Sequence, residues 1–164
     1  EFNVCSSDLG PGTRQAVVDT FQPALALAGR AEAGAKTFQA RCAGCHRLGA
    51  VGQAVGPDLA TMRSGGREKL LLGILDPNRE VAPNFAAYTA ETRDGESLTG
   101  VLLAQGAAGV SLRLAGGGEV TVARANLVAL QGSGRSLMPE GLEEGLSVQE
   151  LADLMEFVLG PAPR

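Results

Sequence analysis

The sequence predicts an α+β fold in which helices form the main body and a small antiparallel sheet is inserted between them. Apolar residues recur at helical spacing in four segments, at 13–21, 31–41, 67–75 and 147–159. Before the last of these, short alternating runs separated by glycine-containing turns indicate strands. The chain has 164 residues, which suits one domain. We expect that domain at 13–160, with helical parts at 30–84 and 131–160 and the sheet at about 85–130.

The composition excludes several classes of protein. The chain carries 18 acidic and 14 basic residues without a dense basic stripe, which argues against a nucleic-acid interface. No apolar run reaches the roughly 18 residues of a membrane span. Aromatic residues make up 4% of the chain and tryptophan is absent. Because each large buried side chain contributes only about 1.5–3 kcal/mol, we expect a bound apolar group to complete the core and the chain without it to fold poorly.

The first residues are expected to be a tail or a cloning remnant. Residues 1–12 show no apolar periodicity, and Cys5 stands there without a nearby partner, which is typical of a free thiol. Thr13 is the expected N-cap of the first helix.

The run Cys42-Ala43-Gly44-Cys45-His46 is the pattern around which the chain is organised. Cys-x-x-Cys-His is the attachment signature of c-type haem. The two thiols add across the two vinyl groups of the porphyrin, and the histidine binds the iron. A structural zinc site would need four ligands, and outside the run the chain offers only Cys5. A thioredoxin-type pair would need a βαβ context, whereas residues 31–41 are predicted to be helical.

Two neighbouring segments are expected to support this group. Gly34, Phe38 and Cys42 are spaced four residues apart and share a helix face. Gly34 would admit a second helix and Phe38 would pack beside the haem, the alternative being ordinary helix residues. After the motif, a glycine-rich loop should return beneath the histidine, so that the Pro57 carbonyl accepts the Nδ1 proton of His46. Otherwise Pro57 is simply a turn residue.

The sheet is predicted from period-two runs and two turns. Asp94-Gly95 is a strong hairpin signal, and three glycines at 116–118 make a second turn. Four or five strands are expected, at 86–93, 97–104, 110–114, 119–123 and 127–130.

A loop at 131–145 should follow the sheet and lead to the closing helix. Glu143-Glu144 is expected to be a solvated part of this loop. Ser147 and Glu150 form a capping box, after which Leu151 and its helical neighbours make an apolar face. Earlier, Asp76-Pro77-Asn78 should end the helix at 67–75.

The second axial ligand must come from a residue other than histidine, because His46 is the one histidine of the chain. Three methionines compete for this position. Met62 follows the Pro57 loop closely and should stay on the His46 side, and Met155 lies mid-helix on an apolar face, where core packing is expected. Met138 lies on a loop before Pro139 and can cross the opposite face of the haem, so it is the preferred ligand. An open or water-filled position is the remaining alternative.

These motifs together resemble a class I c-type cytochrome domain. The resemblance rests on the helix face of Gly34 and Phe38, the haem motif, Gly56-Pro57-Asp58-Leu59, and Met138-Pro139 with its closing helix. The β-rich insertion resembles more narrowly the haem-binding domains of Planctomycetes and Verrucomicrobia. That resemblance implies a class I cytochrome c fold in which the first and last helices cross near Gly34, Phe38 and Phe157. It also implies an exposed haem edge.

The expected function is one-electron transfer by a single covalent haem c bound to Cys42 and Cys45 and ligated by His46 and Met138. The resemblance implies an electron-acceptor domain of, or partner to, an extracytoplasmic dehydrogenase. A monomer in the periplasm or a similar compartment is expected, its signal peptide being absent from this sequence. The alternatives are a ligand-binding or sensor haem with a labile sixth ligand, and a haem enzyme such as a peroxidase.

Charge offers a hypothesis about docking. Residues 140–156 hold six acids and no base, whereas residues 41–69 hold five bases against two acids. This asymmetry could steer a partner electrostatically. The alternative is that both segments are ordinary solvated surfaces.

Overall fold

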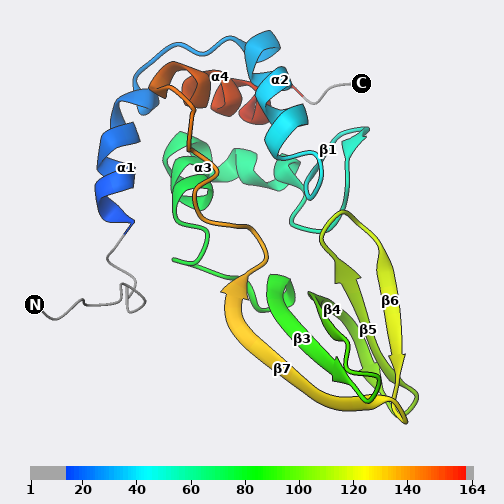
Figure 1. Cartoon of the computed structure of the whole chain (residues 1–164). Helices are drawn as coiled ribbons and strands as arrows, with labels where there is room; N and C mark the ends of the chain where they lie inside the picture. The colour runs from blue at the N-terminus through cyan, green and yellow to red at the C-terminus, as the bar shows by residue number, and fades with distance from the viewer. Residues whose placement is uncertain (1–13, 162–164) are drawn as a thin grey trace, which may run out of the picture.

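The computed structural model describes residues 14–161 and has helices at one end and an antiparallel sheet at the other (Figure 1). The predicted tail at 1–12, Cys5 and Thr13 lie outside the described residues. Arg14 occupies the N-cap position of the first helix and makes no side-chain capping bond. The expected α+β class is confirmed. No helix in the described part is long and apolar enough to cross a membrane.

The helical part contains four α-helices and short 3-10 turns. Three of the α-helices begin and end within a residue of the bounds predicted from apolar spacing, and the fourth, α1, begins two residues later than predicted. The capping box of the last helix is present, because the Ser147 hydroxyl and the Glu150 carboxylate accept each other's backbone N–H. In chain order the elements are α1 (Gln15–Phe21), η1 (Gln22–Leu25), α2 (Ala31–Arg41), η2 (Leu59–Gly65), α3 (Gly66–Leu75), η3 (Pro83–Phe85) and α4 (Val148–Leu159).

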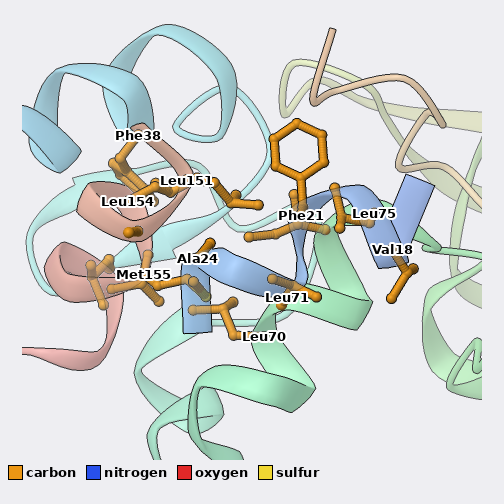
Figure 2. Packing of buried hydrophobic residues seen from close by; sticks show 14 of the residues in the cluster. Val18, Phe21, Ala24, Phe38, Leu70, Leu71, Leu75, Leu151, Leu154 and Met155 are labelled. Carbon is orange, nitrogen blue, oxygen red and sulfur yellow. The ribbon is translucent and has the colours of Figure 1, made fainter. Parts of the chain in front are cut away.

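The buried apolar faces of these helices form the helical core, in which α1, η1, α3 and α4 meet (Figure 2). In this view Ala24 lies between Met155 and Leu71, and Phe38 lies close to Leu151. Met155 is fully buried there, as its position on an apolar helix face predicted. The helical core comprises Val18, Phe21, Ala24, Phe38, Ala43, Leu48, Leu70, Leu71, Ile74, Leu75, Leu151, Ala152, Leu154, Met155 and Val158.

Helices α2 and α4 cross at the point that the resemblance implied. A Cβ on Gly34 would lie 2.0 Å from the Asp153 carbonyl oxygen, so only glycine allows this approach. The rings of Phe38 and Phe157 pack in a tilted arrangement 5.4 Å apart. Asp153 is 1% exposed, and its carboxylate accepts hydrogen bonds from the Arg30 backbone N–H and from Gln149.

The inserted sheet has five strands among the described residues, is antiparallel throughout and has the order β6-β5-β4-β3-β7. Its inner face buries a small cluster, the sheet core, of Ala90, Val110, Leu112 and Val122. Gly95 and Gly116 have φ of 83° and 88°, which accounts for both predicted turns. The strands are β3 (Ala86–Thr92), β4 (Ser97–Gly106), β5 (Gly109–Leu114), β6 (Glu119–Ala123) and β7 (Leu127–Ser136).

The strand β7 corrects the prediction of a loop at 131–145 and of a helical part beginning at residue 131. It continues to Ser136, and Ala86 pairs with Ser136 at its end. The residues Gln131 to Ser136 show no apolar alternation, because they lie on an exposed edge strand. Gly132 lies against the ring of Tyr88, and a Cβ there would be 3.1 Å from the ring. The strand is therefore held by pairing with β3 rather than by its own pattern.

The prediction that Glu143 and Glu144 are both solvated is also wrong in part. Glu144 is exposed, but Glu143 is only 7% exposed and pairs with Arg14. Arg14 also donates to the Leu75 carbonyl at the end of α3. A carboxylate buried in this way needs its cation, and the two lie 129 residues apart in the sequence. Local composition could not predict this contact.

Candidate functional site

The haem motif lies on a turn directly after α2. The helix ends at Arg41, and the Cys42 carbonyl accepts hydrogen bonds from the N–H groups of Cys45 (3.0 Å) and His46 (2.8 Å). Cys42 and Cys45 are free, half-buried thiols. Burial raises the pKa of the Cys42 thiol to about 11, so this group is protonated at neutral pH. One turn thus presents both thiols and the imidazole.

The loop after the motif folds back onto it, as predicted. It begins with a short hairpin whose strands have two residues each, β1 (Arg47–Leu48) and β2 (Val51–Gly52). The sequence does not predict this hairpin. The N–H groups of Val55 (3.0 Å) and Gly56 (2.8 Å) then donate to the Cys45 carbonyl. A Cβ on Gly52 would lie 2.1 Å from the His46 carbonyl oxygen, so glycine is needed for this close approach.

The His46 side chain is oriented by the Pro57 carbonyl. Its Nδ1 lies 2.8 Å from that oxygen, which is the hydrogen bond predicted from the sequence. Burial lowers the pKa of His46, and this hydrogen bond partly opposes the shift. The imidazole is therefore neutral at pH 7 with its proton on Nδ1, since the carbonyl can only accept. The lone pair of Nε2 remains free to bind a metal.

Asp58 holds the loop that carries Pro57. Its carboxylate accepts a hydrogen bond from the Ala60 N–H (2.9 Å), which caps η2, and binds Arg47 of β1 (3.1 Å). The Ala60 N–H and the Arg47 guanidinium keep the pKa of Asp58 below its ordinary value. The Pro57 carbonyl is thus tied to both neighbouring elements.

Arg63 places a buried guanidinium in η2, and the sequence did not predict a role for it. Its Nε and Nη2 are buried and have no hydrogen-bond partner among the described residues. A buried guanidinium without an acceptor is costly. A haem propionate is a carboxylate and could satisfy it. The one signal in the sequence was a base in the turn after Gly56-Pro57-Asp58-Leu59.

Met138 lies two residues after the end of β7 and near His46. Its backbone N–H donates to the Ser136 hydroxyl (3.0 Å), and its half-buried side chain packs against the helical core. Met62 is half-buried in η2, and Met155 is fully buried in the core. Met138 and Met62 are therefore the two methionines whose side chains are not fully buried in the core and could bind an iron.

The residues present fit a c-type haem. Two free thiols stand one turn apart, and an imidazole offers Nε2. Gly56 leaves room for the ring, since a Cβ there would lie 2.6 Å from His46 Cε1. The model of the cytochrome c family matches residues 31–96, which span α2, the motif and α3. The chain contains a cytochrome c domain. Such a domain is an electron carrier rather than an enzyme, and its cofactor is haem c attached through Cys42 and Cys45.

The family match ends at residue 96, in the turn before β4, so it does not reach Met138. No curated protein matches the chain.

The acidic segment at 140–156 is largely paired with arginines of other elements. Arg135 binds Glu140 (3.0 Å), Arg30 binds Asp153 (3.2 Å), and Arg67 binds Glu156 (3.3 Å). With the Arg14–Glu143 pair, four of the six acids at 140–156 have a basic partner. This pairing weakens the field that the sequence suggested could steer a partner.

Proposed function

We propose that this cytochrome c carries one electron at a haem iron held between His46 and Met138. The observation that carries the proposal is that Met138, 92 residues after His46 in the sequence, lies near it on a segment tied to the end of a strand. Haem c, when bound, supplies the Fe(III)/Fe(II) couple. A methionine thioether as second ligand raises the potential of that couple.

The roles of the other site residues follow from their contacts. The Pro57 carbonyl keeps the His46 proton on Nδ1, so the imidazole presents Nε2 in a constant orientation. Arg63 would bind a propionate, and Phe38 packs at the base of the motif next to Ala43 and Cys42 in the helical core. Because these groups are held by backbone and core contacts, electron exchange needs little rearrangement.

Replacing Met138 tests the second ligand. We expect Met138→Ala to abolish the near-infrared charge-transfer band that a methionine–Fe(III) bond produces in the oxidised protein, and to lower the reduction potential. Met62→Ala is the matched control and should keep both. Loss of the band in Met62→Ala, with retention in Met138→Ala, would transfer the role to Met62.

The same measurement separates the alternative function. If the untreated reduced protein binds CO rapidly, the sixth position is labile or open, and a ligand-binding or sensor haem is favoured. Slow CO binding that becomes rapid in Met138→Ala supports electron transfer.

We further propose that the partner is an extracytoplasmic dehydrogenase or a dehydrogenase domain of the same longer chain, in the periplasm or a similar compartment. The family resemblance supports this proposal about the partner. An electron carrier must also receive its electron from one protein and pass it to another. The full reading frame around this sequence tests it. A fused dehydrogenase domain would support the proposal, and a neighbouring terminal oxidase in its place would contradict it.

A further inference from the structure

One side chain outside the haem motif, Asn78, bridges both ends of the segment that carries Met138. Its Oδ1 accepts a hydrogen bond from the Ser136 N–H at 3.0 Å, and its Nδ2 donates to the Glu140 carboxylate. Ser136 and Glu140 lie two residues before and two residues after Met138. The sequence pattern indicates only that Asn78 belongs to a helix-ending turn.

The turn that carries Asn78 is itself firmly held. It follows α3 directly, and the Asp76 N–H still donates to the Leu72 carbonyl (2.8 Å). Asp76 is 6% exposed and binds Arg79 (3.0 Å), while Arg79 also reaches Gln15 in α1. Asn78 thus lies on a turn tied to α3 and α1, and it reaches from there to the end of β7.

The other bonds of the Met138 segment are weaker anchors. Ser136 accepts the Met138 N–H, but both belong to the same short segment. Arg135 pairs with Glu140 (3.0 Å) and is itself two-thirds exposed, so solvent screens this pair. Within residues 14–161, Asn78 is therefore a direct polar link from the helical part to both flanks of Met138.

We infer that Asn78 is a positioning residue that holds Met138 at the iron. The inference rests on the proposed function, in which Met138 is the second axial ligand. An amide is required because the side chain must accept from Ser136 and donate to Glu140 at the same time. Removing it frees the segment, so an external ligand displaces Met138 more easily.

The test uses the haem-containing protein and imidazole as the competing ligand. Titration is followed by loss of the near-infrared methionine band. We expect Asn78→Ala to bind imidazole at least about tenfold more tightly than the unaltered protein, as the loss of one or two hydrogen bonds implies. The control is Asn126→Ala. Asn126 makes a similar two-ended bridge in the turn before β7, to the Arg93 N–H and Asp94, and its removal should change imidazole affinity less than twofold.

A second pair of variants guards against simple misfolding. Asn78→Asp keeps the acceptor for Ser136 but places a carboxylate against Glu140, so imidazole should again bind more tightly. Adding Glu140→Gln restores a donor–acceptor pair with the roles exchanged and should recover most of the original affinity. A purely structural loss would not be rescued in this way.

The outcomes are distinct. If the unaltered protein lacks the methionine band, or Met138→Ala keeps it, the proposed function fails and this inference fails with it. If that band behaves as expected but folded Asn78→Ala and Asn78→Asp bind imidazole as the unaltered protein does, the inference alone is overturned.

Discussion

The absence of a side chain at Gly56 allows the His46 ring to reach its hydrogen-bond acceptor, the Pro57 carbonyl. A Cβ at this position would lie 2.6 Å from Cε1 and 3.0 Å from Nδ1 of the imidazole. Its φ is not in the left-handed region, so the need for glycine here is one of space and not of backbone conformation. Any side chain would push the ring away from the Pro57 carbonyl, which is only 2.8 Å from Nδ1.

Gly56→Ala should therefore disturb the iron ligand itself. We expect the haem-containing variant to lose about 1–3 kcal/mol in its free energy of unfolding, the usual cost of overpacking, and to show shifted paramagnetic NMR resonances of the His46 ring. Gly73→Ala is the control, because nothing lies within 4 Å of the Cβ that it adds in α3. Unchanged His46 resonances in Gly56→Ala would show that the ring does not depend on this gap.

The crossing of α2 and α4 is the contact between elements that places the haem motif. Gly34 lies directly on the backbone of Asp153, and the buried Asp153 carboxylate binds the Arg30 N–H just before α2. Burial raises the pKa of Asp153, but hydrogen bonds from Gln149 and Arg30 outweigh this and hold it below its ordinary value. These contacts thus fix the position and direction of α2, the helix that leads into Cys42.

Widening this crossing should destabilise the whole domain. Gly34→Val adds a branched side chain where even a Cβ would lie 2.0 Å from the Asp153 carbonyl, so the helices must separate. We expect a loss of about 3 kcal/mol or more in chemical denaturation of the haem-containing protein, at the upper end of overpacking costs. Lys36→Val introduces the same side chain on the exposed face of α2 and should cost less than about 1 kcal/mol. Equal losses in the two variants would disprove the close-contact explanation.

At the scale of the whole molecule, the inserted sheet extends away from the helices, and its upper ends lie near them (Figure 1). At one end β7 leads straight into the segment of Met138. At the other, Arg113 of β5 donates to the Ala54 carbonyl (2.7 Å), in the loop that carries Pro57. The sheet core is separate from the helical core, so the sheet is a second small body joined to the haem-bearing part.

Removal of haem should show how far the helical core depends on it. That core contains Ala43 of the motif together with Phe38 before it and Leu48 after it, and Cys42 and Met138 pack against it. We expect a Cys42→Ala/Cys45→Ala variant, which cannot attach haem covalently, to lose cooperative thermal unfolding when measured by circular dichroism. A haem-free variant that unfolds as sharply as the haem-containing protein would contradict this expectation.

Some features could be predicted from the sequence because their signals are local. Helices α2, α3 and α4 follow from apolar spacing and the Ser147–Glu150 box, and the Pro57 hydrogen bond follows from the loop's return to His46. The short strands β1 and β2 were missed because two residues give no periodicity. The buried Glu143 was missed because its partner, Arg14, is remote in sequence.

The sequence by itself determined the chemistry of this protein, because Cys42, Cys45 and His46 stand at a spacing that one turn of backbone can present to a haem. It also determined that these 164 residues contain no second histidine that could serve as an axial ligand. Only the tertiary structure decided which contacts surround those groups. The extension of β7 to Ser136, the bridge from Asn78 and the space beside Gly56 all arise between residues far apart or in opposing elements. Such contacts depend on packing across the whole fold, which no local pattern records.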